Sequence, residues 1–320
     1  SAIAENETLY LPVDTKAGAK FEKWHDGAVL SDALNTVRSA KDFFFPQTEN
    51  LMDFKVDGKN IEIIDTREEC EDFVIFGVRA CDVKSFEILD RVFLAEPVDS
   101  YYKNRREHGV IMSLACTKPH ETCFCGTFGI DASSPEGDIV CHITGDALCM
   151  DAKTEKGKAL LLRLDSLTEE TDGKAVEEQK KVTKERLAKL PLASLSADSF
   201  GAGKTEKFFG APEWKELSQA CLGCGTCTFV CPTCYDIKDF NTGHGVKRFR
   251  CWDSCMYSDF TKMSAGQPRL TQLERFRQRF MHKLVYYPTN NGGLFSCVGC
   301  GRCLSKCPIQ MNIVKKKKKL

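Results

Sequence analysis

The sequence lacks long hydrophobic runs and any excess of charge of one sign. No apolar stretch approaches the roughly 20 residues that span a bilayer. The first residues do not form a secretory signal peptide. The 45 Lys and Arg residues balance 45 Asp and Glu residues, so the formal net charge is zero. We therefore expect a cytoplasmic protein with neither a membrane nor a nucleic acid as its partner.

Motifs for nucleotide binding and for acid–base catalysis are also missing. No GxGxxG sequence follows a predicted strand, so we expect no NAD(P) or flavin in this chain. Residues 201–205 look like the end of a phosphate-binding loop, but Asp198 occupies the position of its first glycine. The six histidines are scattered, at positions 25, 108, 120, 142, 244 and 282. We expect no catalytic residue and no enzymatic activity of the chain by itself.

The two ends of the sequence have features of their own. The chain begins at Ser1 and not at Met, so we expect it to start inside a longer natural sequence. Five consecutive lysines occupy residues 315–319, and we interpret them as a solvated or tag-like tail.

Cysteine, by contrast, is abundant, with eighteen residues. In a short secreted chain such a number predicts disulfides, but this chain has 320 residues and no export signal. Many of the cysteines stand in CxxC-type spacings. These spacings favour metal or cluster ligation in a reducing compartment.

Two stretches near the C-terminus repeat one cysteine pattern. Each has the form C-x2-C-x2-C-x3-C-P, which is the spacing of bacterial two-cluster ferredoxins. Three thiolates within seven residues can wrap one cubane, and the glycines between them permit tight turns. The pattern predicts two [4Fe–4S] clusters. The first stretch contains Cys221, Cys224, Cys227 and Cys231, and the second contains Cys297, Cys300, Cys303 and Cys307.

We expect the two motifs to exchange their fourth cysteines, because the following proline redirects the chain toward the other cluster. Zinc ribbons are the alternative, but zinc does not need this spacing twice, each time before a proline. The predicted ligands are Cys221, Cys224, Cys227 and Cys307 for the first cluster, and Cys297, Cys300, Cys303 and Cys231 for the second.

Four further cysteines predict a third site. The apolar runs at 73–78 and 110–115 flank an amphipathic helix and predict a βαβ unit with parallel strands. Cys81 and Cys116 follow the two strands and should therefore meet at one edge of the sheet. Cys123 and Cys125 complete the set. We interpret it as a third [4Fe–4S] cluster, with a zinc site or free buried thiols as alternatives.

The other six cysteines are not predicted ligands. Free cysteine often behaves as a small buried hydrophobic residue. We expect this of the first three, and we expect the last three, which lie between the motifs, to pack near a cluster. The six are Cys70, Cys141 and Cys149, then Cys234, Cys251 and Cys255.

We predict an α/β domain over residues 1–150, a charged linker or peripheral helix over 151–210, and a ferredoxin-like domain over 211–320. The motif starts are 76 positions apart, farther than in small ferredoxins, and the insert contains a predicted helix at 270–287. We therefore expect the C-terminal domain to be all-α, of the helical ferredoxin-like type.

The insert is also basic, with nine Lys and Arg residues and three acids between Asn241 and Asn290. These cations form a solvated helix face, or they raise cluster potentials and dock an acidic partner.

Several longer stretches carry a resemblance that spans most of the chain. Among them are VRACDVK at 78–84, LDRVF at 89–93, CPTC at 231–234, RCWDSC at 250–255, ERFRQR at 274–279 and CVGCGRC at 297–303. On these residues the chain resembles the family of 4Fe–4S dicluster electron-transfer proteins that serve anaerobic sulfite reductase and that form the beta subunit of sulfhydrogenase. Members often have a further cysteine soon after the CPTC stretch, whereas Tyr235 follows it directly here.

The resemblance implies an N-terminal domain with its own cluster and a heteromeric, anaerobic redox complex. It implies a flavin subunit that takes electrons from NAD(P)H, and a catalytic subunit that is a sirohaem sulfite reductase or a [NiFe] hydrogenase. We therefore predict an electron-relay subunit. A self-contained iron–sulfur reductase and an oxygen-sensing regulatory protein are the alternatives.

Overall fold

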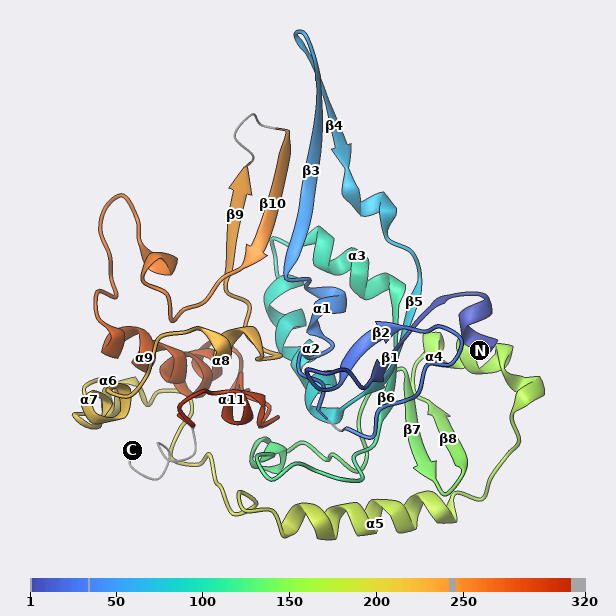
Figure 1. Ribbon diagram of the computed structural model, residues 1–320. Helices are drawn as coiled ribbons and strands as arrows, with labels where there is room; N and C mark the ends of the chain where they lie inside the picture. The colour runs from blue at the N-terminus through green and yellow to red at the C-terminus, as the bar shows by residue number, and fades with distance from the viewer. Residues whose placement is uncertain (1, 34, 242–245, 312–320) are drawn as a thin grey trace.

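The computed structural model describes residues 2–311, apart from Leu34 and residues 242–245. The lysine run at 315–319 and His244 lie outside the described residues. The N-terminal half is built on a six-stranded sheet (Figure 1) with the order β2-β1-β5-β6-β7-β8. Its strands are β1 (Thr8–Val13), β2 (Lys20–Lys23), β5 (Phe73–Val78), β6 (Gly109–Leu114), β7 (Ile139–Thr144) and β8 (Ala147–Ala152).

The four central strands β1, β5, β6 and β7 are parallel, and the edge strands β2 and β8 are antiparallel to their neighbours. In β5, Val74, Ile75 and Val78 are fully buried, as expected for a parallel strand that is covered on both faces. The parallel β5 and β6 flank helix α2 (Ala80–Phe93), so the predicted βαβ unit is present. It brings the ends of β5 and β6 to one edge of the sheet.

Helices cover this sheet. Helix α2 packs on β6, and α4 packs on β6 and β8. The side chain of Asp99 caps α3 by accepting a hydrogen bond of 2.9 Å from the Tyr102 backbone amide. Helix α5 runs along the lower rim in Figure 1 and packs against β7. The remaining helices of this half are α1 (Lys41–Phe44), α3 (Ser100–His108), α4 (Glu155–Arg163) and α5 (Lys174–Ala188).

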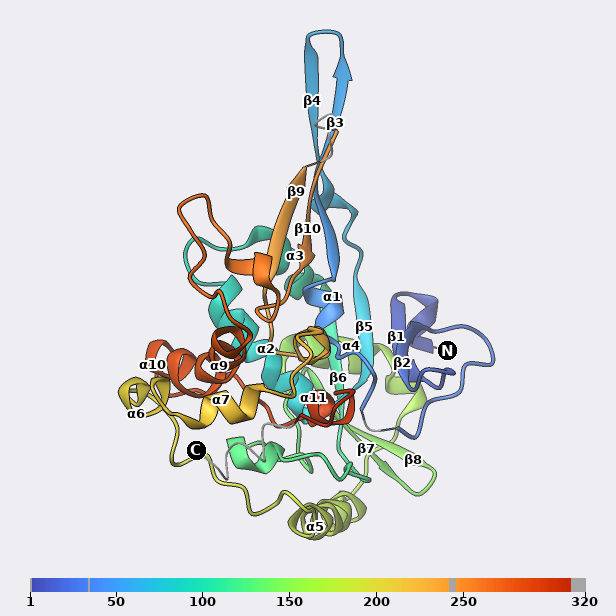
Figure 2. The same ribbon diagram turned by 60° about the vertical axis from the view of Figure 1, so that its left-hand side comes forward.

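A second, four-stranded antiparallel sheet joins the two halves of the chain. The hairpin β3–β4 projects from the body, and β9 and β10 lie beside it (Figure 1, Figure 2). The order is β4-β3-β10-β9, so β10 pairs with a strand almost 200 residues earlier in the sequence. The strands are β3 (Thr48–Asp57), β4 (Asn60–Asp65), β9 (Ile237–Asn241) and β10 (Lys247–Trp252).

The prediction of an all-α, helical ferredoxin-like C-terminal domain is wrong, because β9 and β10 lie between the two cysteine motifs. The sequence here does alternate, and Phe240 and Phe249 stack across the two strands with ring centroids 5.3 Å apart. The strands form because β3 supplies the hydrogen-bonding partner for β10 and Glu49 on β3 pairs with the Arg250 guanidinium at 2.6 Å. That partner comes from the other end of the chain, which local pattern does not indicate.

The rest of the C-terminal half is helical. Thr271 and Glu274 form a capping box at the start of α9, and Phe276 and Phe280 on α9 pack against Trp214. The predicted helix at 270–287 is present as α9, a π-helical turn at His282–Tyr286 and α10. The helices are α6 (Thr205–Phe209), α7 (Glu213–Ser218), α8 (Thr226–Phe229), α9 (Gln272–Met281), α10 (Tyr287–Asn290) and α11 (Arg302–Ser305). Short 3-10 turns occupy Ala2–Glu5, Thr66–Glu69, Cys125–Phe128, Asp165–Leu167 and Ser258–Thr261. No helix in the described ranges is long and apolar enough to cross a membrane.

We predict that Gly157→Ala destabilises the protein although it improves helix propensity. Gly157 lies in α4, where alanine normally stabilises by about 1 kcal/mol. Here a Cβ atom would overlap the carbonyl oxygen of Asp138, so we expect the free energy of unfolding to fall by about 1–3 kcal/mol. Anaerobic chemical denaturation followed by circular dichroism measures this. Gly210→Ala, where a Cβ meets no atom within 4 Å, is the control, and equal stability of both variants would contradict the close approach.

Candidate iron–sulfur sites

The two ferredoxin-type motifs fold in the same way. Gly223 and Gly225 have positive φ angles of 67° and 74°, and Gly299 and Gly301 repeat this with 60° and 76°. In each motif the second glycine caps a one-turn helix, α8 or α11, which carries the third cysteine. Side chains are strained at such φ values, and there is no room for them, because a Cβ on Gly225 would overlap the Tyr257 ring. The glycines therefore set the loop shape that turns the cysteines inward.

The first group of thiols surrounds one pocket. Three of its cysteines come from the first motif, and the fourth comes from the end of the second motif. This is the crossed arrangement that the sequence predicts. The pocket is closed by Phe276, Met256 and Arg279. The four cysteines that line it are Cys221, Cys224, Cys227 and Cys307.

Hydrogen-bond donors point at these sulfurs. Cys221 Sγ accepts from the Gln272 side-chain amide at 3.2 Å and from the Gly223 backbone amide at 3.5 Å. Cys224 Sγ lies 3.3 Å from the Thr226 hydroxyl, and this bond lowers the pKa of Cys224. Cys307 Sγ accepts from the Met311 backbone amide at 3.2 Å. Donors of this kind stabilise thiolates and are typical of a cluster site.

The second group lies deeper. The pKa of the Cys303 thiol is raised to about 12, mainly by burial; the nearby thiols of Cys231 and Cys297 act in the same direction, and Arg279 opposes them. Cys300 also has a raised pKa, because it is buried and because Cys231 and Cys303 lie close to it. The four thiols of this group, Cys231, Cys297, Cys300 and Cys303, are therefore neighbours, and Cys231 comes from the first motif.

The third group lies at the edge of the six-stranded sheet, where β5 and β6 end. Cys81 is in the first turn of α2, Cys116 follows β6, and Cys125 begins a 3-10 turn. The pKa of Cys116 is raised to about 11 and that of Cys125 to about 12, mainly by burial, and the neighbouring Cys123 thiol contributes to both shifts. Cys81 and Cys125 also pack in one buried cluster with Cys300. The structure thus brings all four predicted residues together.

A single metal ion needs a tighter arrangement than a cubane does. Within the part of the chain that the structure describes, no three His, Cys, Asp or Glu side chains are placed to hold one metal ion. In a cubane each of the four irons takes one thiolate, so the four sulfurs lie farther apart than the ligands of a single zinc ion do. The buried thiols and their donors fit the larger group.

Comparison with known proteins identifies the family of the chain. Residues 220–311 match the family model of a 4Fe-4S dicluster domain. Over 319 aligned positions the chain is 33% identical to sulfhydrogenase 2 subunit beta of Pyrococcus furiosus, and the alignment covers 96% of this chain and 90% of that protein. The chain belongs to the sulfhydrogenase beta-subunit family of iron–sulfur electron-transfer proteins. Its cofactors are therefore [4Fe–4S] clusters. No solved structure matches the chain.

In this family member, buried cations stand beside the thiols. Arg279 on α9 is close to Cys227 and Cys303; burial alone would lower its pKa, but these thiols raise it. Lys283, one turn further, is close to Cys231 and Cys297, and its Nζ donates to the Thr233 hydroxyl at 2.8 Å. Both side chains are buried. They supply positive charge where cluster–thiolate assemblies are negative.

The nine basic residues of the insert therefore have different roles. Arg279 and Lys283 face the thiols, whereas Arg250 forms buried ion pairs with Glu49 and Asp99. Lys247 and Arg248 pair with acids of the second sheet. The remaining four are only partly buried or exposed, as a solvated face requires: Lys262, Arg269, Arg275 and Arg277.

Lys41 is a further buried cation that sequence reasoning missed. Its Nζ donates to the Cys234 carbonyl at 2.8 Å and lies 3.5 Å from the Trp252 ring centroid. Burial lowers its pKa to about 8, although the Cys234 and Cys231 thiols oppose this. Lys41 starts a short helix 180 residues before the first motif, so no sequence signal connects it to the site.

The extra cysteines of the insert lie near the site to different degrees. The thiol of Cys234 hydrogen bonds to Cys231, which lowers the pKa of Cys231 and raises that of Cys234. Cys255 is close to Cys227, and its backbone amide donates to Asp236 at 3.1 Å. Cys251 instead lies on β10, against the Thr48 hydroxyl. Cys234 is thus placed as a donor to a ligand candidate.

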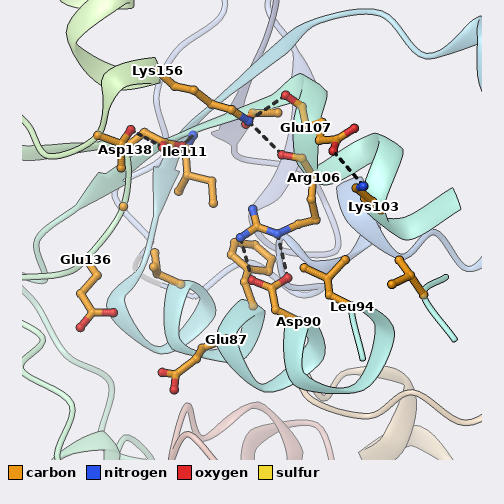
Figure 3. Close-up of a pocket in the computed structure, with 16 residues that line it drawn as sticks. Glu87, Asp90, Leu94, Lys103, Arg106, Glu107, Ile111, Glu136, Asp138 and Lys156 are labelled. Atoms are coloured by element: carbon orange, nitrogen blue, oxygen red, sulfur yellow. Dashed lines mark hydrogen bonds and ion pairs between the residues drawn. The ribbon is translucent and has the colours of Figure 1, made fainter. Parts of the chain in front are cut away.

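None of these cysteines lines the wide surface hollow that Figure 3 shows. It has a volume of about 620 Å³ and is bounded by α2, α3 and the start of β6. Several of its polar groups already have partners: Arg106 pairs with Asp90 at 2.9 Å, and Lys156 Nζ donates to the backbone carbonyls of Arg106 and Glu107. The size of this hollow does not make it the functional site, since the thiols gather elsewhere.

We predict that Lys283→Met lowers the midpoint potential of one cluster. A buried cation favours the reduced, more negative state, so its loss should shift the potential down by on the order of 60 mV, a tenfold change for a one-electron couple. A redox titration followed by EPR measures this. Lys262→Met, at an exposed position of the insert, is the control. Equal shifts in both variants would contradict a specific role for Lys283.

Proposed function

We propose that this chain relays single electrons between a flavin subunit that binds NAD(P)H and a catalytic subunit of the same complex. One observation carries the proposal: the three thiol groups lie side by side. Cys227 of the first group influences the ionisation of Cys303 of the second, and Cys300 of the second influences that of Cys81 of the third. A relay requires such a row, because an electron moves readily only between neighbouring centres.

The row has an outer and an inner part. Of the twelve cysteines in the three groups, all of which the structure describes, Cys224 alone is exposed. Cys81, Cys125 and Cys300 are buried. A partner can therefore approach the first group most closely, whereas the cysteines of the second and third groups are buried or only partly exposed. This gradient supports the first group as the point where electrons enter or leave the chain.

We assign the ligands accordingly. When bound, each [4Fe–4S] cluster takes up and gives back one electron. The cysteines hold the irons, and Arg279 and Lys283 balance the charge of the first two groups. The proposed sets are Cys221, Cys224, Cys227 and Cys307; Cys231, Cys297, Cys300 and Cys303; and Cys81, Cys116, Cys123 and Cys125 for a third cluster.

The partners follow from the family. The relative is named as the beta subunit of a sulfhydrogenase, which supports a multi-subunit complex and favours a hydrogenase-type catalytic partner over a sulfite reductase. Flavin and NAD(P) belong to another subunit in this proposal. The abundance of free thiols supports a reducing cytoplasm as its location and anaerobic conditions for its work.

We predict about twelve irons per chain, and about eight after Cys81→Ser or Cys116→Ser. Removing one thiolate from the third group should cost that cluster alone, because the other two groups keep all their ligands. Iron and acid-labile sulfide assays on anaerobically purified protein measure this. Cys141→Ser is the matched control, since Cys141 is fully buried but belongs to none of the three groups. A wild-type content of about eight irons would contradict the third cluster and would leave the proposal of a two-cluster relay.

We further predict that NADH or NADPH reduces the clusters only when the flavin subunit is present. The subunits that purify with the chain identify that partner, and anaerobic EPR follows cluster reduction with and without it. Direct reduction of the isolated chain by the nicotinamide, or turnover of a small substrate by the isolated chain with dithionite, would favour a self-contained reductase. Stable single-chain protein without partners and with rapid cluster loss in air would favour an oxygen sensor.

A further inference from the structure

A buried ion pair joins the loop of the second thiol group to that of the third. Asp82 directly follows Cys81, and Arg302 lies between Cys300 and Cys303. The two nitrogens Nη1 and Nη2 of Arg302 lie 2.5 and 2.7 Å from the two carboxylate oxygens of Asp82. The exposed fractions of the two side chains are 2% and 1%. The contact is thus bidentate, dry and flanked on both sides by proposed ligands.

Arg302 is fixed further by the N-terminal half of the chain. Its Nε donates to the Thr36 carbonyl at 2.9 Å, and Nη2 lies 3.3 Å from the Thr36 hydroxyl. A planar guanidinium with partners on two sides cannot rotate, unlike a lysine ammonium on a flexible stem. The position of α11, which begins at Arg302, is therefore set by groups that belong to the other end of the sequence.

The backbones of the two loops are equally close. The Phe124 amide donates to the Gly299 carbonyl at 2.9 Å. The Asn35 side-chain amide donates to the Cys300 carbonyl at 2.9 Å and lies 3.7 Å from Cys123 Sγ. A Cβ on Gly299 would overlap the Phe124 carbonyl. The second and third groups therefore share a wall, with the ion pair across it.

We propose that Asp82 and Arg302 are a positioning pair that holds the third cluster at a fixed, short separation from the second and so sets the electronic coupling between them. This inference rests on the proposed function, because it requires the third cluster. A buried ion pair seldom stabilises a fold more than apolar residues of the same volume would. Its bidentate geometry does fix orientation. Tunnelling falls steeply with separation, so a fixed separation is what a relay needs at this point.

The pair is also neutral as a unit, and this separates position from charge in an experiment. The double variant Asp82→Leu with Arg302→Met removes the clamp without changing the net charge, and replaces it with apolar groups that a buried site tolerates. Arg302→Lys keeps the positive charge but loses the bidentate geometry of the guanidinium. The control is Arg250→Met with Glu49→Leu, which is a more severe change because it also breaks the ion pairs of Arg250 with Asp99 and of Glu49 with Arg105. It removes a pair with exposed fractions of 7% and 1% that also joins the two halves but has no proposed ligand next to it in sequence.

The test measures magnetic coupling between reduced clusters in the intact, anaerobically purified chain. We expect EPR spectra of fully reduced wild-type protein to contain a splitting that disappears in Cys81→Ser and hence involves the third cluster. In the double variant the splitting should be lost while the iron content stays at the wild-type level. The rate of electron transfer from the second to the third cluster, measured by rapid-freeze EPR, should fall on the order of tenfold or more. The Arg250→Met, Glu49→Leu control should keep the wild-type splitting.

Several outcomes would overturn the inference. One is wild-type splitting in a double variant that holds all its iron. If the double variant loses iron, the Arg302→Lys variant provides the test. Wild-type splitting and a wild-type rate in Arg302→Lys would show that the bidentate guanidinium contact is not needed. If the wild-type chain holds iron for two clusters only, both this inference and the proposed third cluster are wrong. The two-cluster relay would remain, because it is tested separately by reduction through the flavin subunit.

Discussion

Clusters ligated by thiolates are negatively charged, and a protein interior accepts such charge only when donors and cations surround it. This constraint shapes the C-terminal half of the molecule. Helix α9 and the π-helical turn that continues it divide their faces accordingly: Phe276, Phe280 and Leu284 enter the apolar core, while Arg279 and Lys283 lie close to the sulfurs. Residues four apart lie close together on a helix, so this one continuous segment both packs the core and supplies two cations.

The same constraint explains why distant segments interlock. Charge compensation for the second thiol group comes from Lys283 in the insert and from Lys41 near the N-terminus. Two buried ion pairs tie the halves together, Glu49 with Arg250 and Asp82 with Arg302, across 201 and 220 positions of sequence. The second sheet adds the pairing of β3 with β10. Because the thiol groups share walls and cations, they form one connected structure built from both ends of the sequence.

The features of this molecule that its sequence predicts are those that depend on residues close together in the chain. The cysteine spacing, the glycines with positive φ and the parallel strands that place Cys81 near Cys116 all follow from local pattern and from one rule of sheet topology. The strands β9 and β10 do not, because their alternation is short and their partner β3 lies at the other end of the chain. Lys41 and the Asp82–Arg302 pair are invisible for the same reason: each is an ordinary charged residue until the fold buries it beside a thiol.

Next to Lys283, a tyrosine and a histidine form a pair that fits this electrostatic picture. The Tyr235 hydroxyl lies 3.0 Å from His282 Nε2. Burial and the adjacent Lys283 lower the pKa of His282 to about 4, so the imidazole is neutral near pH 7. Burial likewise raises the pKa of Tyr235 to about 12 and keeps its phenol neutral. Tyr235 and His282 therefore form a neutral, hydrogen-bonded pair, and Lys283 remains the charged group beside the second set of ligands.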